Sequence, residues 1–235
     1  TFAAFLTRAY DFVRMAAVSQ ANIRLVGSHA GVSIGEDGPS QMGLEDIASM
    51  RAIHGSTVLY PSDANQSTYL VSEMYDRTGV VYMRTTREAT PVIYDSNEEF
   101  PIGGSRVMRV TNHDMVTLVA AGITLHEALK AAVLLEASDI FARVIDLYSV
   151  KPIDERTLIE AGEATGKIIT IEDHWSEGGI GDAVLQVFSN SGLRPQIVKL
   201  AVTDMPTSGT PQQLLHSAGI DAEHIVLAAK ELVIQ

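Results

Sequence analysis

The chain has 235 residues, of which 46% are apolar, so it can fold as one large or two ordinary domains with substantial cores. Its 17 basic and 29 acidic residues give a formal net charge of −12, which argues against nucleic-acid and anionic-membrane partners because both bind basic surfaces. The chain has no cysteine and no apolar run of the roughly 18 residues that span a membrane. We therefore expect a protein of a reducing compartment, in this case the cytoplasm.

The first residues show no secretory signal, and the chain starts on Thr1 inside a helical pattern, without an initiator methionine. We therefore expect a fragment of a longer protein. Apolar residues at helical spacing between Phe2 and Ala16 predict a first helix of about four turns.

Apolar strands alternate with amphipathic helices in the first part of the chain. Strands are predicted at residues 23–26, 56–60 and 80–83, and helices at 44–50 and from about 63 to 76. Asp63 with Gln66 three residues later is typical of a capped helix start, and Pro39 is placed to begin a further helix. This alternation implies right-handed crossovers and a parallel sheet.

A polar, turn-rich segment at 95–104 predicts a linker, after which the alternation resumes. Strands are predicted at 116–120, 142–147, 168–171 and 196–201, and helices at 125–136, 154–164, 181–188, 211–216 and 221–233. The expected fold is therefore α/β, with two parallel or mostly parallel sheets and helices on both faces. We place the first domain at 1–100, the linker at 101–112 and the second domain at 113–235.

Residues 27–41 form the segment richest in chemistry, Gly-Ser-His-Ala-Gly-Val-Ser-Ile-Gly-Glu-Asp-Gly-Pro-Ser-Gln. The segment follows a predicted strand, and ligands of α/β sheets bind where strands end. Its glycines permit positive φ and a close approach of the backbone to a ligand. A solvated strand-to-helix turn without function is the alternative interpretation.

Five segments of the chain occur in the order and spacing found in transketolases. They are Thr1-Phe2-Ala3-Ala4-Phe5, the loop 27–41, Tyr60-Pro61-Ser62-Asp63, Arg84-Thr85-Thr86-Arg87 and Glu172-Asp173-His174-Trp175-Ser176-Glu177-Gly178-Gly179-Ile180-Gly181. The chain resembles the animal-type and split bacterial branch of that family over nearly its whole length. The Gly-Glu-Asp-Gly-Pro-Ser-Gln run is the specific element, because deoxyxylulose-phosphate synthases have only a similar acidic loop and ketoacid dehydrogenase β-subunits lack it.

Phe2 and Phe5 lie three residues apart, so they share a helix face, which is more often part of a core. The resemblance implies that Phe5 stacks on the aminopyrimidine ring of thiamine diphosphate, with Phe2 and Arg8 nearby. An aromatic face offers a heterocycle apolar area without using its hydrogen-bonding edge. These three residues are therefore the expected cofactor-binding residues.

The resemblance also assigns the sugar-phosphate substrate. It implies that His29, a loop imidazole able to exchange protons, contacts the donor ketose as the catalytic residue. Asp37 is expected to bind a sugar hydroxyl, with Gln41 assisting. Arg84 and Arg87 are candidates for the phosphate, and Arg87 is the one that matches a family phosphate contact; an isolated surface arginine is the alternative interpretation of either.

The segment 172–181 contains two carboxylates and a glycine-rich turn after a predicted strand. Such geometry can bind an anion, but no basic residue follows, so a turn that fixes the domain interface is the favoured interpretation. The other histidines, at positions 54, 113, 126, 216 and 224, show no metal-ligand spacing, and we assign no metal to the chain.

Two parts of a transketolase site lie outside this sequence according to the resemblance: the glutamate that activates the cofactor, and the amino-terminal domain that binds diphosphate with Mg²⁺ or Ca²⁺. The implied reaction is transfer of a two-carbon ketol unit between ketose and aldose phosphates. We expect the chain alone to be inactive and to work with that amino-terminal domain or subunit, in a homodimer or heterotetramer. The alternatives are a deoxyxylulose-phosphate synthase, a ketoacid dehydrogenase β-type subunit, or a non-catalytic interaction subunit of the same fold.

Overall fold

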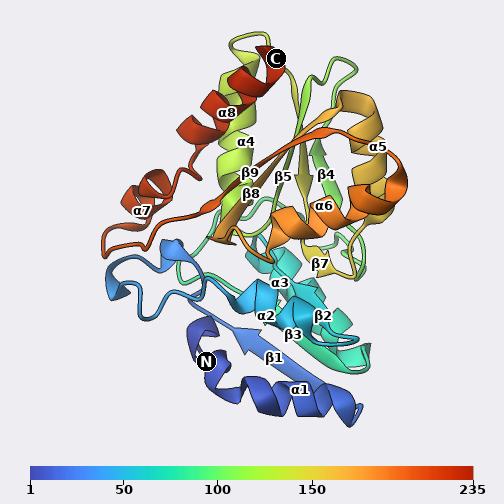
Figure 1. Cartoon of the computed structure of the whole chain (residues 1–235), viewed down its shortest axis with the longest axis vertical. Helices are drawn as coiled ribbons and strands as arrows, with labels where there is room; N and C mark the ends of the chain where they lie inside the picture. Colours follow the sequence, from blue (N-terminus) through green and yellow to red (C-terminus); the bar gives the residue numbers. More distant parts are fainter. Residues whose placement is uncertain (235) are drawn as a thin grey trace.

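A computed structural model describes residues 1–234, which form two lobes that each contain a β-sheet (Figure 1). The lobe nearest the amino terminus holds a four-stranded sheet of order β1-β3-β2-β7, and the other lobe a five-stranded sheet of order β4-β6-β5-β8-β9. All neighbouring strands are parallel except the pairs β2–β7 and β4–β6. The expected fold of two mostly parallel sheets with helices on both faces is confirmed.

The first lobe is built from the elements up to residue 84. These are the 3₁₀ helix η1 (Ala3–Ala9), α1 (Tyr10–Val18), β1 (Ile23–Gly27), the 3₁₀ segment η2 (Val32–Asp37), α2 (Asp46–Ala52), β2 (Thr57–Leu59), α3 (Ala64–Asp76) and β3 (Val80–Arg84). Helix α3 begins as predicted, because the Asp63 carboxylate accepts a hydrogen bond from the Gln66 amide at 2.7 Å. In a capping box the Gln66 side chain would accept from the Asp63 amide, but here it accepts a hydrogen bond from the Ser62 amide.

The second lobe contains the remaining elements. These are β4 (Arg106–Arg109), β5 (Val116–Ala120), α4 (Ile123–Glu136), β6 (Ala142–Asp146), β7 (Ser149–Lys151), α5 (Glu155–Thr165), β8 (Lys167–Trp175), α6 (Ile180–Ser191), β9 (Gln196–Val202), α7 (Pro211–Ser217) and α8 (Ala222–Ile234). Strand β7 leaves this lobe and pairs with β2 of the first sheet, so the two sheets are joined by backbone hydrogen bonds.

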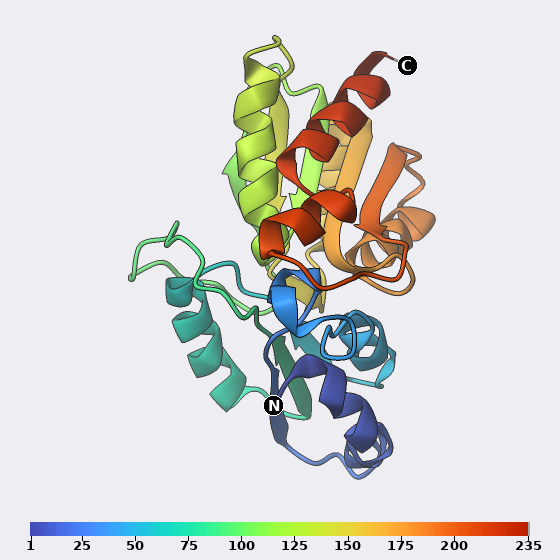
Figure 2. The same ribbon diagram turned by 90° about the vertical axis from the view of Figure 1, so that its left-hand side faces the viewer.

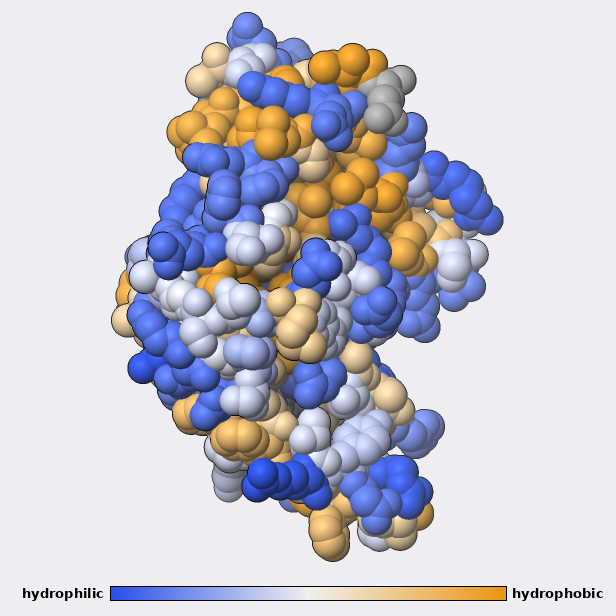
Figure 3. Space-filling view, turned by 60° about the vertical axis from the view of Figure 1, so that its left-hand side comes forward, coloured by the Kyte–Doolittle hydropathy of each residue, from blue (hydrophilic) through white to orange (hydrophobic). Residues whose placement is uncertain are grey.

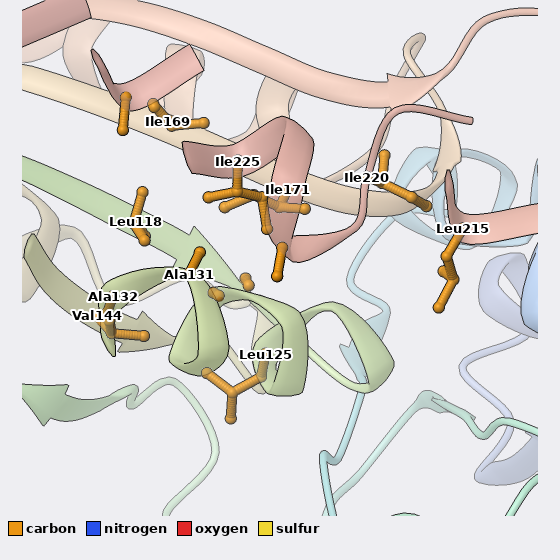
Figure 4. Packing of buried hydrophobic residues seen from close by; sticks show 14 of the residues in the cluster. Leu118, Leu125, Ala131, Ala132, Val144, Ile169, Ile171, Leu215, Ile220 and Ile225 are labelled. Atoms are coloured by element: carbon orange, nitrogen blue, oxygen red, sulfur yellow. The ribbon is translucent and has the colours of Figure 1, made fainter. Parts of the chain in front are cut away.

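Helices cover both faces of the second sheet. Helices α4 and α8 pack on one face and α5 and α6 on the other (Figures 1 and 2). The α4–α8 side encloses a large apolar cluster that includes Leu118, Leu125 and Ile171 (Figure 4). A second cluster contains Val58 of the first sheet together with Val119 of the second, so the apolar core continues from one lobe into the other.

The molecular surface differs between the lobes. In Figure 3 the upper part of the molecule, over α4 and α8, shows more apolar surface than the lower part. Val133 and Leu134 of α4 and Leu227 of α8 are each at least half exposed. Within residues 1–234, no helix combines the length and the apolarity needed to cross a membrane.

The predicted first helix is interrupted, because residues 3–9 form η1 and only residues 10–18 form an α-helix. The start of the chain is tied to the strand beside it: the Ala3 amide donates to Ser28 O at 2.7 Å, and the Ser28 amide donates to Thr1 O at 2.9 Å. Local spacing could not reveal these long-range hydrogen bonds.

The predicted helix at Pro39 is wrong. Gly35 kinks the η2 segment and Gly38 ends it, with φ values of 84° and 80° that only glycine adopts easily. Residues 39–42 then close a turn, in which the Gln41 amide donates to Gly38 O, and the next helix begins at Asp46.

The predicted linker 101–112 contains strand β4, which pairs with β6 at the edge of the second sheet. The preceding polar segment is anchored as well. Phe100 is completely buried, with its ring edge-on to Tyr94 at 4.8 Å and to Tyr148 at 5.5 Å. A short edge strand between turn residues carries too few apolar positions to be recognised from the sequence.

Candidate active site

Three aromatic rings form a stack at the carboxyl end of β1. The rings of Phe5 and Phe2 are 5.7 Å apart and nearly parallel, and the ring of Phe2 lies 4.1 Å from the His29 imidazole. His29 has a φ of 57°, a left-handed conformation that is uncommon outside glycine, and its Nδ1 lies 3.0 Å from Ser28 Oγ. The structure therefore brings together Phe2, Phe5 and His29, three of the residues predicted for the site.

The ring of Phe5 is 38% exposed and lines a cavity of about 490 Å³. Arg8 lines the same cavity, with its guanidinium 5.5 Å from the centre of the Phe5 ring. The opposite wall comes from the second lobe, through Trp175 and Met205, and from the loop at Pro39 and Ser40. The cavity thus offers an aromatic face and a cation to a flat heterocycle.

Arg87 holds the acidic part of the loop 27–41. Its guanidinium donates a hydrogen bond to Ile34 O at 3.0 Å and lies 3.3 Å from the Asp37 carboxylate and 3.8 Å from that of Glu36. Arg87 and Asp37, both predicted to bind substrate, are therefore direct neighbours. The side chain of Arg87 is 40% exposed, so its guanidinium can be reached from solvent.

The strands bring this ion pair to the same edge of the sheet as His29. Gly27 at the end of β1 is in register with Arg84 at the end of β3, and the Ala30 amide donates to Thr85 O at 3.2 Å. The segments that carry His29 and Arg87 thus run side by side. Gln41 lies further along the same loop, where its side-chain oxygen accepts from Ser40 Oγ at 3.0 Å.

Arg84 is fully buried and does not face solvent, so its interpretation as a phosphate ligand is wrong. Its Nε lies 3.0 Å from Asp46 Oδ2, and its Nη2 donates to Gly43 O and Asp173 O. Burial acts to lower the pKa of Arg84, but the pKa is raised because the nearby Asp46 and Asp173 carboxylates, together with Tyr60 and Tyr82, outweigh burial. Arg84 thus connects the two lobes, because its hydrogen-bond partner Asp173 belongs to β8 of the second lobe.

The segment Glu172-Asp173-His174 continues strand β8 instead of forming a turn. Asp173 accepts hydrogen bonds from the Val32 amide at 2.6 Å, the Ser33 amide at 3.3 Å and Ser33 Oγ at 2.8 Å. A Cβ on Gly31 would lie 2.0 Å from Asp173 Oδ2, so a glycine is required there. A carboxylate of the second lobe therefore fixes the backbone of the candidate loop in the first.

The neighbours of Asp173 serve the lobe junction as well. Glu172 accepts from the amides of Ile180 and Gly181 at the start of α6, yet burial raises its pKa to about 7. Burial also lowers the pKa of His174 to about 4, so its ring is neutral at neutral pH. His174 Nδ1 lies 2.7 Å from Trp175 O, and its Nε2 can then accept from the Ala48 amide.

Sequence reasoning missed a buried carboxylate on β6. Asp146 accepts hydrogen bonds from Tyr94 Oη at 2.6 Å, Gln66 Nε2 at 2.8 Å and Ser62 Oγ at 3.1 Å. Burial raises its pKa to about 6. Ser62 also lines a cavity of about 220 Å³ beside Thr86. The motif Tyr60-Pro61-Ser62-Asp63 contains one of the hydrogen-bond partners of Asp146, but no local pattern connected this motif with β6.

The spacing of the histidines also hid a contact. His216 and His224 belong to different helices, but their rings are 4.8 Å apart and both contact Asp221. Their pattern, His-x₄-Asp-x₂-His, is interrupted by the turn at Gly219, so neither helix alone shows it. The expectation that these histidines are scattered is wrong for this pair.

Comparison with known proteins defines the two parts of the chain. A family model of the transketolase pyrimidine binding domain matches residues 1–92, and one of the transketolase C-terminal domain matches residues 105–225. The fold is therefore that of a transketolase pyrimidine binding domain joined to a transketolase C-terminal domain. The chain belongs to the transketolase family.

Individual relatives agree with this assignment. The chain is 52% identical over its whole length to "Transketolase-like protein 2" of Mus musculus and 47% identical over 99% of its length to "Transketolase" of Homo sapiens. It covers only 38% and 37% of these two relatives. A solved structure named "Split gene transketolase, inactive beta4 tetramer" superimposes with a TM-score of 0.91 at 35% identity, over 99% of this chain and 75% of that one.

Proposed function

We propose that this chain is the carboxy-terminal part of a transketolase, which transfers a two-carbon ketol unit reversibly between ketose and aldose phosphates. The observation that supports this most directly is the stack of Phe5, Phe2 and His29 beside an aromatic-lined cavity at the end of β1. The synthase and ketoacid dehydrogenase alternatives are not favoured, because both matching family models are those of transketolase. The chain spans only 38% and 37% of two of its relatives, and we propose that activity also requires the parts of a transketolase outside the matched region.

The cofactor proposed for this site is thiamine diphosphate, and the residues around Phe5 fit its pyrimidine ring. The exposed face of Phe5 offers a stacking surface, Phe2 supports that ring from behind, and Arg8 closes one side. Bound there, the cofactor would supply the electron sink for two-carbon transfer. The diphosphate and its Mg²⁺ or Ca²⁺ are assigned to an amino-terminal domain or subunit.

The sugar phosphate is assigned to the loop 27–41 and Arg87. In this proposal His29 exchanges a proton with the reacting hydroxyl, and its stacking on Phe2 and its contact with Ser28 Oγ support a fixed ring position. Asp37 accepts a hydrogen bond from a sugar hydroxyl, with Gln41 beside it on the loop. The Arg87 guanidinium binds the phosphate, and part of its present contact with Asp37 is replaced by the contact with the phosphate.

The proposed partners follow from the same division of the site. The chain works with a diphosphate-binding domain or subunit in a homodimer or heterotetramer in the cytoplasm, and it takes no nucleic acid or membrane partner. A β-subunit tetramer named as inactive among the solved structures supports an assembly that needs a further subunit. Alone, this chain should show no ketol transfer and should bind thiamine diphosphate only weakly, since most partners of the diphosphate charge are missing.

Steady-state kinetics of the assembled enzyme test these roles. Arg87→Ala should mainly raise the KM of phosphorylated donors, because a phosphate contact binds ground and transition states alike. It should leave hydroxypyruvate, a donor without phosphate, nearly unaffected. His29→Ala should lower kcat by about a hundredfold with either donor, because a proton-exchanging group acts in the transition state.

Arg156→Ala is the matched control, since Arg156 is 87% exposed on α5 and pairs only with Glu160. It should change neither kinetic constant. An equal loss of activity with both donors in Arg87→Ala would reject the phosphate role. Micromolar binding of thiamine diphosphate to the isolated chain, measured by calorimetry with Mg²⁺, would reject the division of the site.

A further inference from the structure

Two histidines and an aspartate converge at the turn between α7 and α8. Asp221 Oδ2 lies 2.7 Å from His216 Nδ1, and Asp221 Oδ1 lies 2.6 Å from His224 Nδ1. One ligand atom from each residue lies within 4.8 Å of those of the other two. We propose that His216, Asp221 and His224 form a binding site for a divalent transition-metal cation such as Zn²⁺.

The fold holds the three side chains on rigid backbone. Leu215, Ile220 and Ile225, each next in sequence to one of the proposed ligands, are at most 3% exposed and belong to the apolar cluster shown in Figure 4. The side chain of Asp221 is 16% exposed, whereas the side chains of His216 and His224 are 59% and 35% exposed. Burial of these three apolar residues therefore fixes the turn and leaves the ligands accessible from one side. Such support limits the reorganisation that binding requires.

The donor set suits a borderline metal ion rather than Mg²⁺. Two imidazole nitrogens with one carboxylate are typical ligands of Zn²⁺, Ni²⁺ and Cu²⁺, whereas Mg²⁺ prefers oxygen ligands. A neutral imidazole can carry its proton on Nε2, which leaves the Nδ1 lone pair for the metal. Ligand atoms about 2.1 Å from one tetrahedral ion lie about 3.4 Å apart, so on binding both imidazole nitrogens must withdraw slightly from the Asp221 oxygens, which they now contact at 2.7 and 2.6 Å.

The charges around the turn favour a cation. Asp221 is joined by Glu223, whose carboxylate lies 3.9 Å from His216 Nδ1. Two carboxylates outweigh the partial positive charge of about half a unit at the start of α8. The side chain of His216 is 59% exposed, so water can reach the remaining coordination positions from solvent. This site would be independent of the proposed ketol transfer.

Isothermal titration of the full chain with ZnCl₂, with CuCl₂ and with MnCl₂ tests the proposal. At about pH 7.5 we expect one site, with Cu²⁺ bound more tightly than Zn²⁺ and Mn²⁺ bound most weakly. The double variant His216→Gln/His224→Gln should weaken Zn²⁺ binding at least about tenfold. Protons compete for imidazole nitrogens, so the affinity should fall as the pH is lowered towards about 5.5.

The double variant His54→Gln/His113→Gln is the matched control, because both of these histidines are exposed and lie outside the turn. It should bind Zn²⁺ as the parent does. Far-UV circular dichroism checks that each variant is folded, and electron paramagnetic resonance of the Cu²⁺ complex should show nitrogen ligands that the His216→Gln/His224→Gln variant lacks. Equal loss in both double variants, or no Zn²⁺ binding by the parent, would overturn the proposal.

Discussion

Replacement of Arg84 tests the role of the buried ion pair at the lobe junction. Arg84→Met removes the ion pair to Asp46 at 3.0 Å, the hydrogen bonds to Gly43 O and Asp173 O, and the contact of the guanidinium with the Tyr60 ring at 4.7 Å. Methionine replaces much of the side-chain volume but none of these interactions. The Asp46 carboxylate, which is 2% exposed, then keeps only Tyr82 Oη as a donor.

The expected loss follows from that unpaired charge. Removing one partner of a buried ion pair lowers the free energy of unfolding by about 3–5 kcal/mol. Arg87→Met is the matched control three residues away, where the ion pair is exposed and the loss should stay below about 1 kcal/mol. Urea unfolding followed by circular dichroism gives both values from the shift of the midpoint at constant slope.

A second variant separates the charge from the lost contacts. Asp46→Asn keeps an acceptor for Tyr82 Oη but removes the negative charge. In the background of Arg84→Met it should restore at least about 1 kcal/mol, because the two residues are coupled through that charge. If Arg84→Met destabilised the protein no more than Arg87→Met does, the buried ion pair of Arg84 would not stabilise the junction of the lobes.

Two further predictions concern the contacts of β8. Gly31→Ala should destabilise the protein by about 2 kcal/mol more than Gly192→Ala in the same urea assay, because both glycines have positive φ but only a Cβ at position 31 would displace the Asp173 carboxylate. Folding raises the pKa of Glu172 from 4.5 to about 7 and lowers that of His174 from 6.5 to about 4. As the pH rises between about 5 and 6.5, the free energy of unfolding therefore falls through Glu172 and rises through His174, so the two effects oppose each other. Glu172→Gln removes the first effect, and the free energy of unfolding should then rise with pH by up to about 1.4 kcal/mol per pH unit.

Each of these two has a clear contrary outcome. Equal stabilities of the Gly31→Ala and Gly192→Ala variants would show that the close approach of Asp173 is relieved without loss. An unchanged pH profile in Glu172→Gln, from unfolding midpoints measured across that range, would show that Glu172 ionises in the folded protein at its ordinary pKa.

The alternation of strands and helices was sufficient to predict the architecture. Most elements lie within two or three residues of their predicted positions because each buries a face whose period is visible locally, such as Val116–Ala120 in β5. The capped start of α3 at Asp63 was predictable for the same reason, since the cap is a contact over three residues. The loop 27–41 and its resemblance to transketolases likewise depended only on the local sequence.

Elements fixed by distant contacts were not predictable. The segment 172–175 contains three ionisable side chains and is typical of a loop, yet it continues β8, because amides of the first lobe and of α6 bind its carboxylates. Strand β4 exists because β6 offers it an edge. The Val32 amide lies 141 residues from Asp173 along the chain, and the residues of β6 that pair with β4 lie at least 35 residues away, so neither partner belongs to the local pattern.

The sequence by itself determined the fold class and the family, and it indicated the candidate site residues. Only the tertiary structure decided which of the two arginines at and after the end of β3 is accessible to solvent: Arg84 is buried against Asp46, and Arg87 is exposed beside Asp37. It also brought His216 and His224 to one carboxylate across a turn. Burial and pairing of a charge depend on residues far apart in the chain, whereas the periodicity of a segment indicates only which of its faces is buried.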